Sequence, residues 1–313
     1  MNIETLKDYK LVWSDEFDGD SLDNTKWTIS EDDVPKNNED GSLALVYSGE
    51  KESVRVENGS LCLQNRFDKK TGLFVAPKSV NTKKTMSFKY GYLEVRAKIP
   101  FMQGTLVDLK AFAKGAIGSE ENAPYYSQMN IIQYDAWLYS ITGRISKVYE
   151  NYDKNSPFYK LNHYGEDMGP IDSSSKAQID GLLTPDSFRG SFAVDKKDDF
   201  LTCGFLWTEN EVEIFVEGRK IIRINLTRDF IRESGLDGFR KPHYLEFQNS
   251  LKIERVFEKV WLGFKKDDDE ANENEDFKNA SSKAEYIARQ YPFEIDYVRL
   301  YQKDGEGELN LAE

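Results

Sequence analysis

Hydrophobic and polar residues alternate with a period near two along most of this 313-residue chain. This spacing is typical of strands with one buried face. Clusters of Gly, Asn, Asp and Pro separate the alternating segments. The clearest strands are expected at Ser53–Val56, Ser60–Gln64, Tyr92–Ile99, Glu211–Val216 and Lys220–Ile224.

Turn chemistry supports the same interpretation. Glu217-Gly218 lies between two alternating segments and predicts a tight hairpin. Helical composition occurs only in two short segments, Thr227–Ser234 and Ser281–Gln290. Many strands without intervening helices favour a sandwich or jelly roll over a parallel α/β sheet. We therefore expect an all-β fold.

The chain is expected to form a single domain over residues 1–313, with its core at about 10–303. The segment 265–290 begins with a run of Asp, Glu and Asn and is expected to be a solvated loop inserted before the closing strand. Its acidic run lacks the glycine and ligand spacing of an EF-hand. Residues 304–313 are expected to be a frayed tail.

Charge limits the classes of partner. The chain has 42 Lys+Arg and 55 Asp+Glu, a net charge of −13. Nucleic acids and anionic membranes are therefore not expected as partners, because phosphate binding needs clustered cations. Aromatic residues make up 13% of the chain, which favours β structure. No feature indicates an oligomer, so a monomer is expected.

Cysteine content and the N-terminus say little about compartment. Cys62 and Cys203 each lie in an apolar, strand-like setting, so neither a disulfide framework nor a cysteine zinc site is expected. Met1–Lys10 lacks the pattern of a secretory signal. The chain is expected to be either cytoplasmic or the mature form of a secreted protein.

Six ordered motifs carry a family resemblance. They are Leu11–Gly19 with Lys26-Trp27, Glu57–Leu61, Phe88–Pro100, His163–Gly165, Leu206–Thr208 with Phe215–Gly218, and Ile295–Gln302. In this order they resemble glycoside hydrolase family 16, the group of laminarinases, lichenases, agarases and carrageenases. The resemblance implies a concanavalin A-like jelly roll of two antiparallel sheets, with a concave cleft that binds a β-linked glycan.

The resemblance also shows where this chain departs from the family. Family members carry Glu-x-Asp-x-x-Glu, with a nucleophile, its modulating Asp and a general acid/base. The matching residues here are Gln128, Asn130 and Gln133. Residues 128 and 130 share a strand face by alternation, and one bulge residue at 131–132 would return 133 to that face. All three amides are therefore expected to point into the cleft.

Amides cannot perform the family's reaction. Retaining hydrolysis needs two carboxyl groups about 5–5.5 Å apart, one to attack and one to protonate. An amide is neither basic nor acidic enough for these roles, but it offers two donors and an acceptor to sugar hydroxyls. The family's stacking Trp segment is also absent at Gly104–Phe112. Sugar stacking is instead expected from Tyr134, Trp137 or Tyr139, although packing roles are equally open to them.

The remaining site predictions rest on the resemblance. His163 matches a histidine that lines the family's cleft, whereas His243 and Asn249 have no such support. The family's calcium ligands on the convex face match Glu16, Gly59 and Asp296, and these residues could equally be structural acceptors. No cofactor is required by any of these roles.

Three functions stay open on the sequence. The first is a glycan-binding protein that does not hydrolyse. The second is an active endo-glycosidase acting on a β-glucan or galactan, with displaced carboxylates or with amides introduced deliberately. The displaced groups would be among Asp108, Asp135, Glu166 and Asp167, with Asp135 expected to need a further bulge to face the cleft. The third is a scaffold whose acidic surface binds a protein.

Overall fold

The computed structural model describes residues 6–31, 36–37, 43–100, 105–113, 115–118, 125–135, 140–149, 177–178, 189–193, 199–226, 238–251 and 292–312. Strands dominate this part of the chain, and its helical content is one 3₁₀ turn, η4 (Gly238–Arg240). The fold is all-β, as the sequence predicts. Both helical segments and the acidic segment 265–290 lie outside the described residues.

Two eight-stranded sheets form the body of the molecule. In the first, the order is β19 (Arg219–Asn225), β18 (Glu211–Val216), β17 (Leu201–Trp207), β11 (Gly91–Lys98), β21 (Phe293–Lys303), β6 (Ser60–Leu63) and β5 (Val54–Glu57), with β1 (Tyr9–Asp15) also paired to β21. In the second, the order is β15 (Ala177–Gln178), β14 (Ser140–Tyr149), β13 (Tyr125–Asp135), β12 (Thr105–Phe112), β20 (Tyr244–Leu251), β9 (Val80–Asn81) and β2 (Thr28–Ile29), with β16 (Arg189–Ala193) paired to β14.

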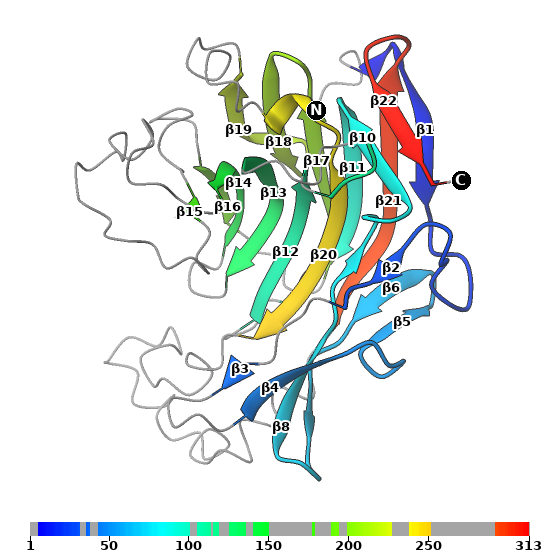
Figure 1. The fold of residues 1–313 in the computed structure, drawn as a ribbon, viewed down its shortest axis with the longest axis vertical. Helices are drawn as coiled ribbons and strands as arrows, with labels where there is room; N and C mark the ends of the chain where they lie inside the picture. Colours follow the sequence, from blue (N-terminus) through cyan, green and yellow to red (C-terminus); the bar gives the residue numbers. More distant parts are fainter. Residues whose placement is uncertain are drawn as a thin grey trace, which may run out of the picture.

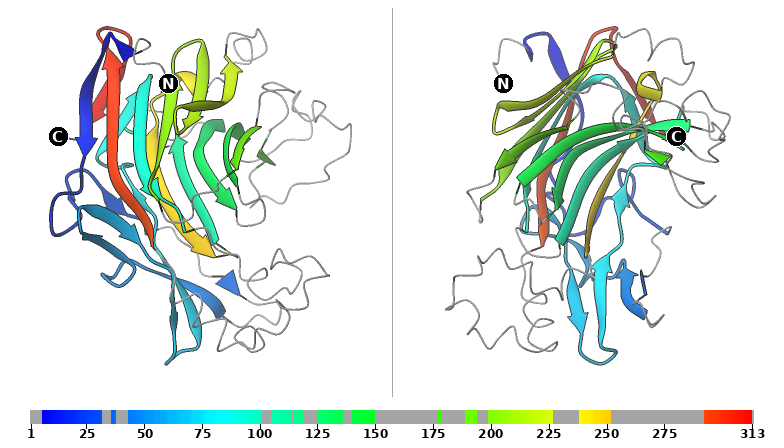
Figure 2. Two further views of the ribbon diagram at one scale, coloured as in Figure 1. Left: turned by 180° about the vertical axis from the view of Figure 1, so that it is seen from behind. Right: turned by 90° about the vertical axis from the view of Figure 1, so that its left-hand side faces the viewer.

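The two sheets pack face to face. Figure 2 shows them as two curved layers. Alternate residues of each strand enter one apolar core, for example Val107 and Leu109 on β12 and Val95 on β11, all fully buried. Burial of this apolar area drives the packing of the two layers. The other residues of β12 are therefore turned away from the core.

Two smaller sheets complete the described fold. β3 (Lys36–Asn37), β4 (Leu43–Ser48), β8 (Leu73–Pro77) and β7 (Arg66–Asp68) form a four-stranded sheet at one end (Figure 1), in which β4 and β8 run parallel. β10 (Met86–Lys89) pairs with β22 (Glu308–Leu311). Across the ranges that are described, no helix is both long and apolar enough to cross a membrane.

The predicted turn at Glu217-Gly218 is present, and a second tight turn shares its geometry. The hairpin of β18 and β19 turns through Glu217 and Gly218, whose φ angles are 49° and 73°. Asn58 and Gly59 turn β5 into β6 with φ angles of 54° and 75°. Two successive positive φ angles suit the right-handed twist of the flanking strands.

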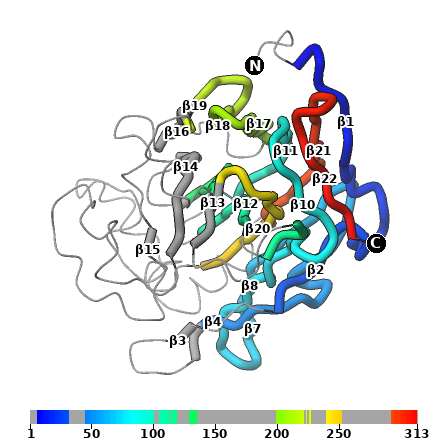
Figure 3. Tube along the Cα trace, turned by 45° about the horizontal axis from the view of Figure 1, so that its top comes forward, coloured from blue at the N-terminus to red at the C-terminus, as the bar shows by residue number. Residues whose placement is uncertain are grey.

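The predicted frayed tail is wrong. Residues 308–311 form β22, which pairs along its length with β10 and lies beside it in the tube of Figure 3. Leu309 packs against the main core, and the Ala312 amide donates to the Thr85 carbonyl. Alternation in Glu308–Leu311 is too short to stand out in the sequence, and its partner strand is over 200 residues away.

Candidate functional site

The site is built on β13, where a bulge sets which side chains share a face. The register of β13 against β12 pairs Gln128 with Phe112, Asn130 with Lys110 and Gln133 with Asp108, with a shift between Leu109 and Lys110. The register against β14 shifts over the same residues, between Asn130 and Gln133. The extra residue returns position 133 to the face of 128 and 130. The predicted bulge is therefore confirmed.

This face is the one turned away from the core. The bulge residues Ile131 and Ile132 are buried with the core cluster, whereas Gln133 is half-buried on the opposite side. We call it the site face and define it by alternating positions in the backbone register of four neighbouring strands (Figure 1): Leu106, Asp108, Lys110 and Phe112; Gln128, Asn130 and Gln133; Tyr244, Glu246, Gln248 and Ser250; and Thr142, Arg144 and Ser146.

A carboxylate, an amide and an ammonium meet at its centre. The Gln133 Nε2 donates to Asp108 Oδ1 at 3.0 Å. The Lys110 Nζ lies 3.1 Å from Asp108 Oδ2 and donates to Gln248 Oε1 at 3.2 Å. Asp108 is 1% exposed, so both of its oxygens are held by protein donors rather than by solvent. Burial of this charge is compensated by the two partners.

Electrostatics keep Lys110 charged. Burial acts to lower the pKa of its ammonium, but the carboxylates of Asp108 and Glu246 outweigh burial, so the net shift is upward. The ammonium of Lys110 is therefore charged at neutral pH and pairs with Asp108. A third charge of either sign at position 133 would disturb this pair.

The amide at 133 complements Asp108 chemically. A carboxylate in place of Gln133 would put two acidic oxygens about 3 Å apart, and one of them would have to hold a proton. An amide of nearly the same shape instead supplies the donor that Asp108 accepts from. Gln133 thus fits the chemistry of its neighbour, which a family-type Glu would not.

The aromatic residues of the site differ from those predicted. Tyr134 is fully buried in the main core, because it follows Gln133 and therefore points to the other side of the sheet. Its predicted role as a sugar-stacking surface is wrong. Phe112 is half-buried on the site face instead, opposite Gln128, and its ring stacks on Tyr244 with centroids 5.4 Å apart.

Sequence reasoning missed Phe112 and Lys110. The alternation of Leu106, Asp108, Lys110 and Phe112 within an otherwise apolar segment was the available signal. The expectation for Asp135 is also corrected. Its backbone pairs with Leu106, so it occupies a position on the site face without a further bulge.

Several of the predicted site residues lie outside the described part of the chain. Trp137, Tyr139, His163, Glu166 and Asp167 are not among the described residues. The side chain of Gln128 is likewise not described, although its backbone position is. These site predictions stay as predictions.

His243 and Asn249 have structural surroundings. His243 is fully buried, its Nδ1 lies 2.7 Å from the Lys241 carbonyl, and burial lowers the pKa of its imidazole to about 3. Asn249 is 1% exposed and points inward, where its Nδ2 donates to the Leu63 carbonyl at 2.8 Å. Both residues belong to the interior rather than to the site face.

Two of the three predicted calcium ligands, Glu16 and Asp296, are paired with arginines. The Arg299 guanidinium donates to both oxygens of Glu16, at 3.0 and 2.6 Å, and this bidentate contact lowers the pKa of Glu16. Arg96 donates to Asp296 Oδ2 at 2.5 Å. Within the described ranges, no three acidic, His or Cys side chains cluster as metal ligands. Glu16 and Asp296 are thus already paired with arginines, and the calcium site stays a prediction.

Both cysteines are free and buried, as expected. Burial raises the pKa of the Cys62 thiol to about 11 and that of Cys203 to about 12. Neither thiol is ionised at neutral pH, so neither acts as a nucleophile.

Known structures share this architecture. A mutant of a non-specific endo-β-1,3(4)-glucanase from family GH16, crystallised with a glucan oligosaccharide at its active site, superposes with a TM-score of 0.62 at 22% identity, covering 95% of this chain and 96% of that one. The laminarinase catalytic domain of Thermotoga maritima gives 0.57 at 19% identity, covering 95% and 99%. The protein has the fold of the family GH16 glucanases.

Two further comparisons concern another solved structure and a curated relative. An endo-acting O-glycanase of the human gut microbiota that initiates mucin breakdown superposes with a TM-score of 0.60 at 20% identity, covering 96% of this chain and 93% of that one. Glucan endo-1,3-beta-glucosidase A1 of Niallia circulans is 31% identical over 121 residues, 34% of this chain and 17% of the relative. The match thus spans about a sixth of that relative's length. No protein-family model matches the sequence.

Proposed function

We propose that this protein is a non-hydrolysing member of glycoside hydrolase family 16 that binds a β-linked glycan on the site face. The observation that carries the proposal is the hydrogen bond from Gln133 to Asp108, together with the ion pair of Asp108 and Lys110. These contacts fix the amide of Gln133 in the site beside an ion-paired carboxylate. The glucanase fold supports a glycan as the ligand.

The chemistry of the site face suits binding. Amides at positions 128, 130 and 133 offer donors and acceptors to sugar hydroxyls, and Phe112 offers an apolar ring beside position 128. No covalent intermediate forms on these groups, because an amide oxygen is a weak nucleophile. The sugar is held by hydrogen bonds and ring contact alone.

An active glycosidase is the second candidate, because Asp108 and Asp135 occupy neighbouring positions on the site face. Hydrolysis needs one carboxyl group to attack and another to donate a proton. Both oxygens of Asp108 already accept bonds from Gln133 and Lys110. The attack or proton transfer by Asp108 would first have to break these bonds, so binding is the better supported function.

Restoring the family's acids tests the proposal. We would make Gln128→Glu, Asn130→Asp and Gln133→Glu together, with and without Asp108→Asn, and assay laminarin, lichenan, galactan and mucin O-glycans beside the unaltered chain. We expect no turnover by the unaltered chain and the greatest turnover when Asp108→Asn accompanies the three acids, since it removes the competing carboxylate. Turnover by the unaltered chain that Asp108→Asn abolishes would favour the active glycosidase instead.

A further inference from the structure

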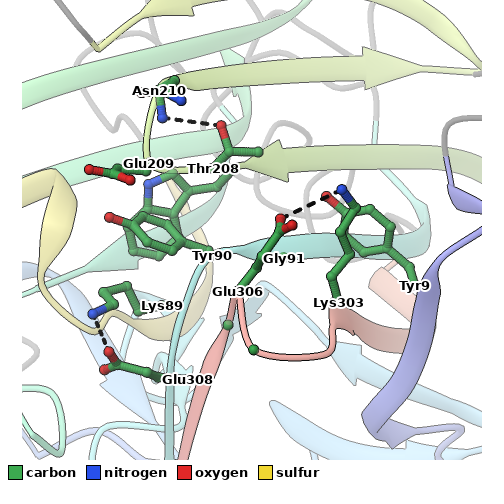
Figure 4. A pocket seen from close by; sticks show the side chains of 13 residues that line it. Tyr9, Lys89, Tyr90, Gly91, Thr208, Glu209, Asn210, Lys303, Glu306 and Glu308 are labelled. Atoms are coloured by element: carbon green, nitrogen blue, oxygen red, sulfur yellow. Dashed lines mark hydrogen bonds and ion pairs between the residues drawn. The ribbon is translucent and has the colours of Figure 1, made fainter.

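A cavity lies away from the site face. It has a volume of about 530 Å³ and is formed where the β17–β18 turn, the β21–β22 turn, the start of β1 and the end of β10 meet. Figure 4 shows its lining, which includes Tyr9, Tyr90, Thr208, Asn210, Glu306 and Glu308. We call it the tyrosine pocket. Its volume falls within the range of small-molecule sites.

Hydrogen bonds fix the backbone at Tyr90, which forms one side of the tyrosine pocket. The Gln302 amide, 6% exposed, donates to the carbonyls of Lys89, Tyr90 and Glu308 at 3.2, 2.9 and 2.9 Å. This holds Tyr90 at a φ of 60°, a conformation that bulky residues rarely adopt. The Tyr90 ring also packs edge-on against Trp207, with centroids 5.2 Å apart. The ring is therefore pre-positioned before any ligand arrives.

The charges of the pocket are largely paired with one another. Lys89 bonds Glu308, and the Lys303 Nζ lies 3.6 Å from Glu306 Oε2. The two ammonium groups also lie 5.5 Å from the ring centroids of Tyr90 and Tyr9, respectively. The pocket therefore offers many hydrogen-bonding groups and two aromatic rings without a strong net charge. A strongly ionic ligand would have to break existing pairs.

We propose that the tyrosine pocket binds a neutral pyranose sugar. Pyranoses combine an apolar C–H face, which packs on a phenol ring, with hydroxyls that both donate and accept hydrogen bonds. Tyr9 and Tyr90 supply the rings, and Thr208, Asn210 and Glu209 supply polar groups on the β17–β18 turn. The lining comes from β1, β10, β11, β17, β21, β22 and the turns between them, whereas the site face belongs to β12, β13, β14 and β20. The pocket thus does not depend on the function proposed for the site face.

Saturation-transfer NMR with the full chain tests this site. The probes are the methyl pyranosides of glucose, galactose, mannose, N-acetylglucosamine and N-acetylgalactosamine, each at millimolar concentration. The pocket variants are Tyr9→Ala and Asn210→Trp, the latter placing a bulky ring on an exposed turn without touching the core. Tyr297→Ala is the matched control, because it removes a tyrosine from the same sheet outside the pocket. Gln133→Ala reports on the site face.

We expect at least one pyranoside to bind, with affinity reduced about tenfold in both pocket variants, as lost ring packing predicts. The same sugar should bind unchanged to Tyr297→Ala. Gln133→Ala should change only the contribution of the site face and leave the loss caused by the two pocket variants in place. If no pyranoside binds, or if binding is kept by both pocket variants, the inference is overturned. Binding that only Gln133→Ala weakens would overturn it too, while supporting a glycan site on the site face.

Discussion

At the residue scale, Gln133 places an amide beside the carboxylate of Asp108, at a position where the family motif has a Glu. The Gln133 Nε2 and Asp108 Oδ1 are 3.0 Å apart, so the identity of each residue constrains the other. The sequence alone could give the position of Gln133, because family order and alternation fix it. It could not give its partner, because strand register decides which residue lies opposite.

Gln133→Glu should destabilise the protein in a pH-dependent way. The new carboxyl would face Asp108, so its pKa in the folded state would rise above about 4.3, the ordinary value of Glu. The penalty, about 1 to 3 kcal/mol for a shift of one to two pKa units, should be full at neutral pH and vanish as the pH falls toward about 4. Chemical denaturation at several pH values measures it. Gln133→Met, which adds no charge, should show a penalty that does not vary with pH, and an equal pH profile for both variants would contradict the account.

His243 should make the protein sensitive to mild acid. Its folded-state pKa of about 3 lies below the ordinary value of 6.5, so the unfolded chain takes up a proton first as the pH falls. The free energy of unfolding should therefore drop by roughly 1.5 kcal/mol between pH 6.5 and 5. His243→Asn, whose amide can reach the Lys241 carbonyl, should be less stable at pH 7 but lose this slope. The same slope in both proteins would show that His243 is not the source.

At the element scale, a single bulge decides the site. Without the extra residue at 131–132, Gln133 would enter the core and Tyr134 would face outward. The need for this bulge followed from the motif's spacing, whereas the error on Tyr134 came from not applying the same alternation one residue further. The place of Phe112 on the site face could not be predicted in the same way, because it depends on the register of β12 against β13.

The C-terminal strand gives a prediction of its own. Removing residues 304–313 should lower the free energy of unfolding by about 2 to 4 kcal/mol, because β22 contributes its pairing with β10 and the apolar contact of Leu309. A frayed tail would cost almost nothing. Denaturant titration of the truncated and full chains decides between these results. Removal of Ala312 and Glu313 alone is the matched control and should cost much less.

At the scale of the whole molecule, two sheets around one core were predictable from alternation and turn chemistry. The positions of the sheets' edges were not, because strands such as β22 and β9 are too short to show a pattern and pair with distant segments. The tyrosine pocket was hidden for the same reason, since its lining comes from four separate parts of the chain.

Glycan binding should depend on Phe112 more than on an equivalent ring elsewhere. Phe112→Ala removes the apolar surface beside position 128 and should weaken retention in a polysaccharide gel about five- to tenfold. Tyr297→Ala, on the other sheet, should leave retention unchanged. Equal weakening by both variants would indicate a general loss of structure rather than a site.

The most direct test of the account follows binding and cleavage together. The unaltered chain is equilibrated with laminarin, lichenan, galactan and mucin O-glycans, and each mixture is assayed for bound protein and for new reducing ends. The account predicts retention on at least one of these glycans with no more reducing ends than the glycan alone releases. Release of reducing ends in proportion to added protein, lost when Asp108 is changed to Asn, would contradict it.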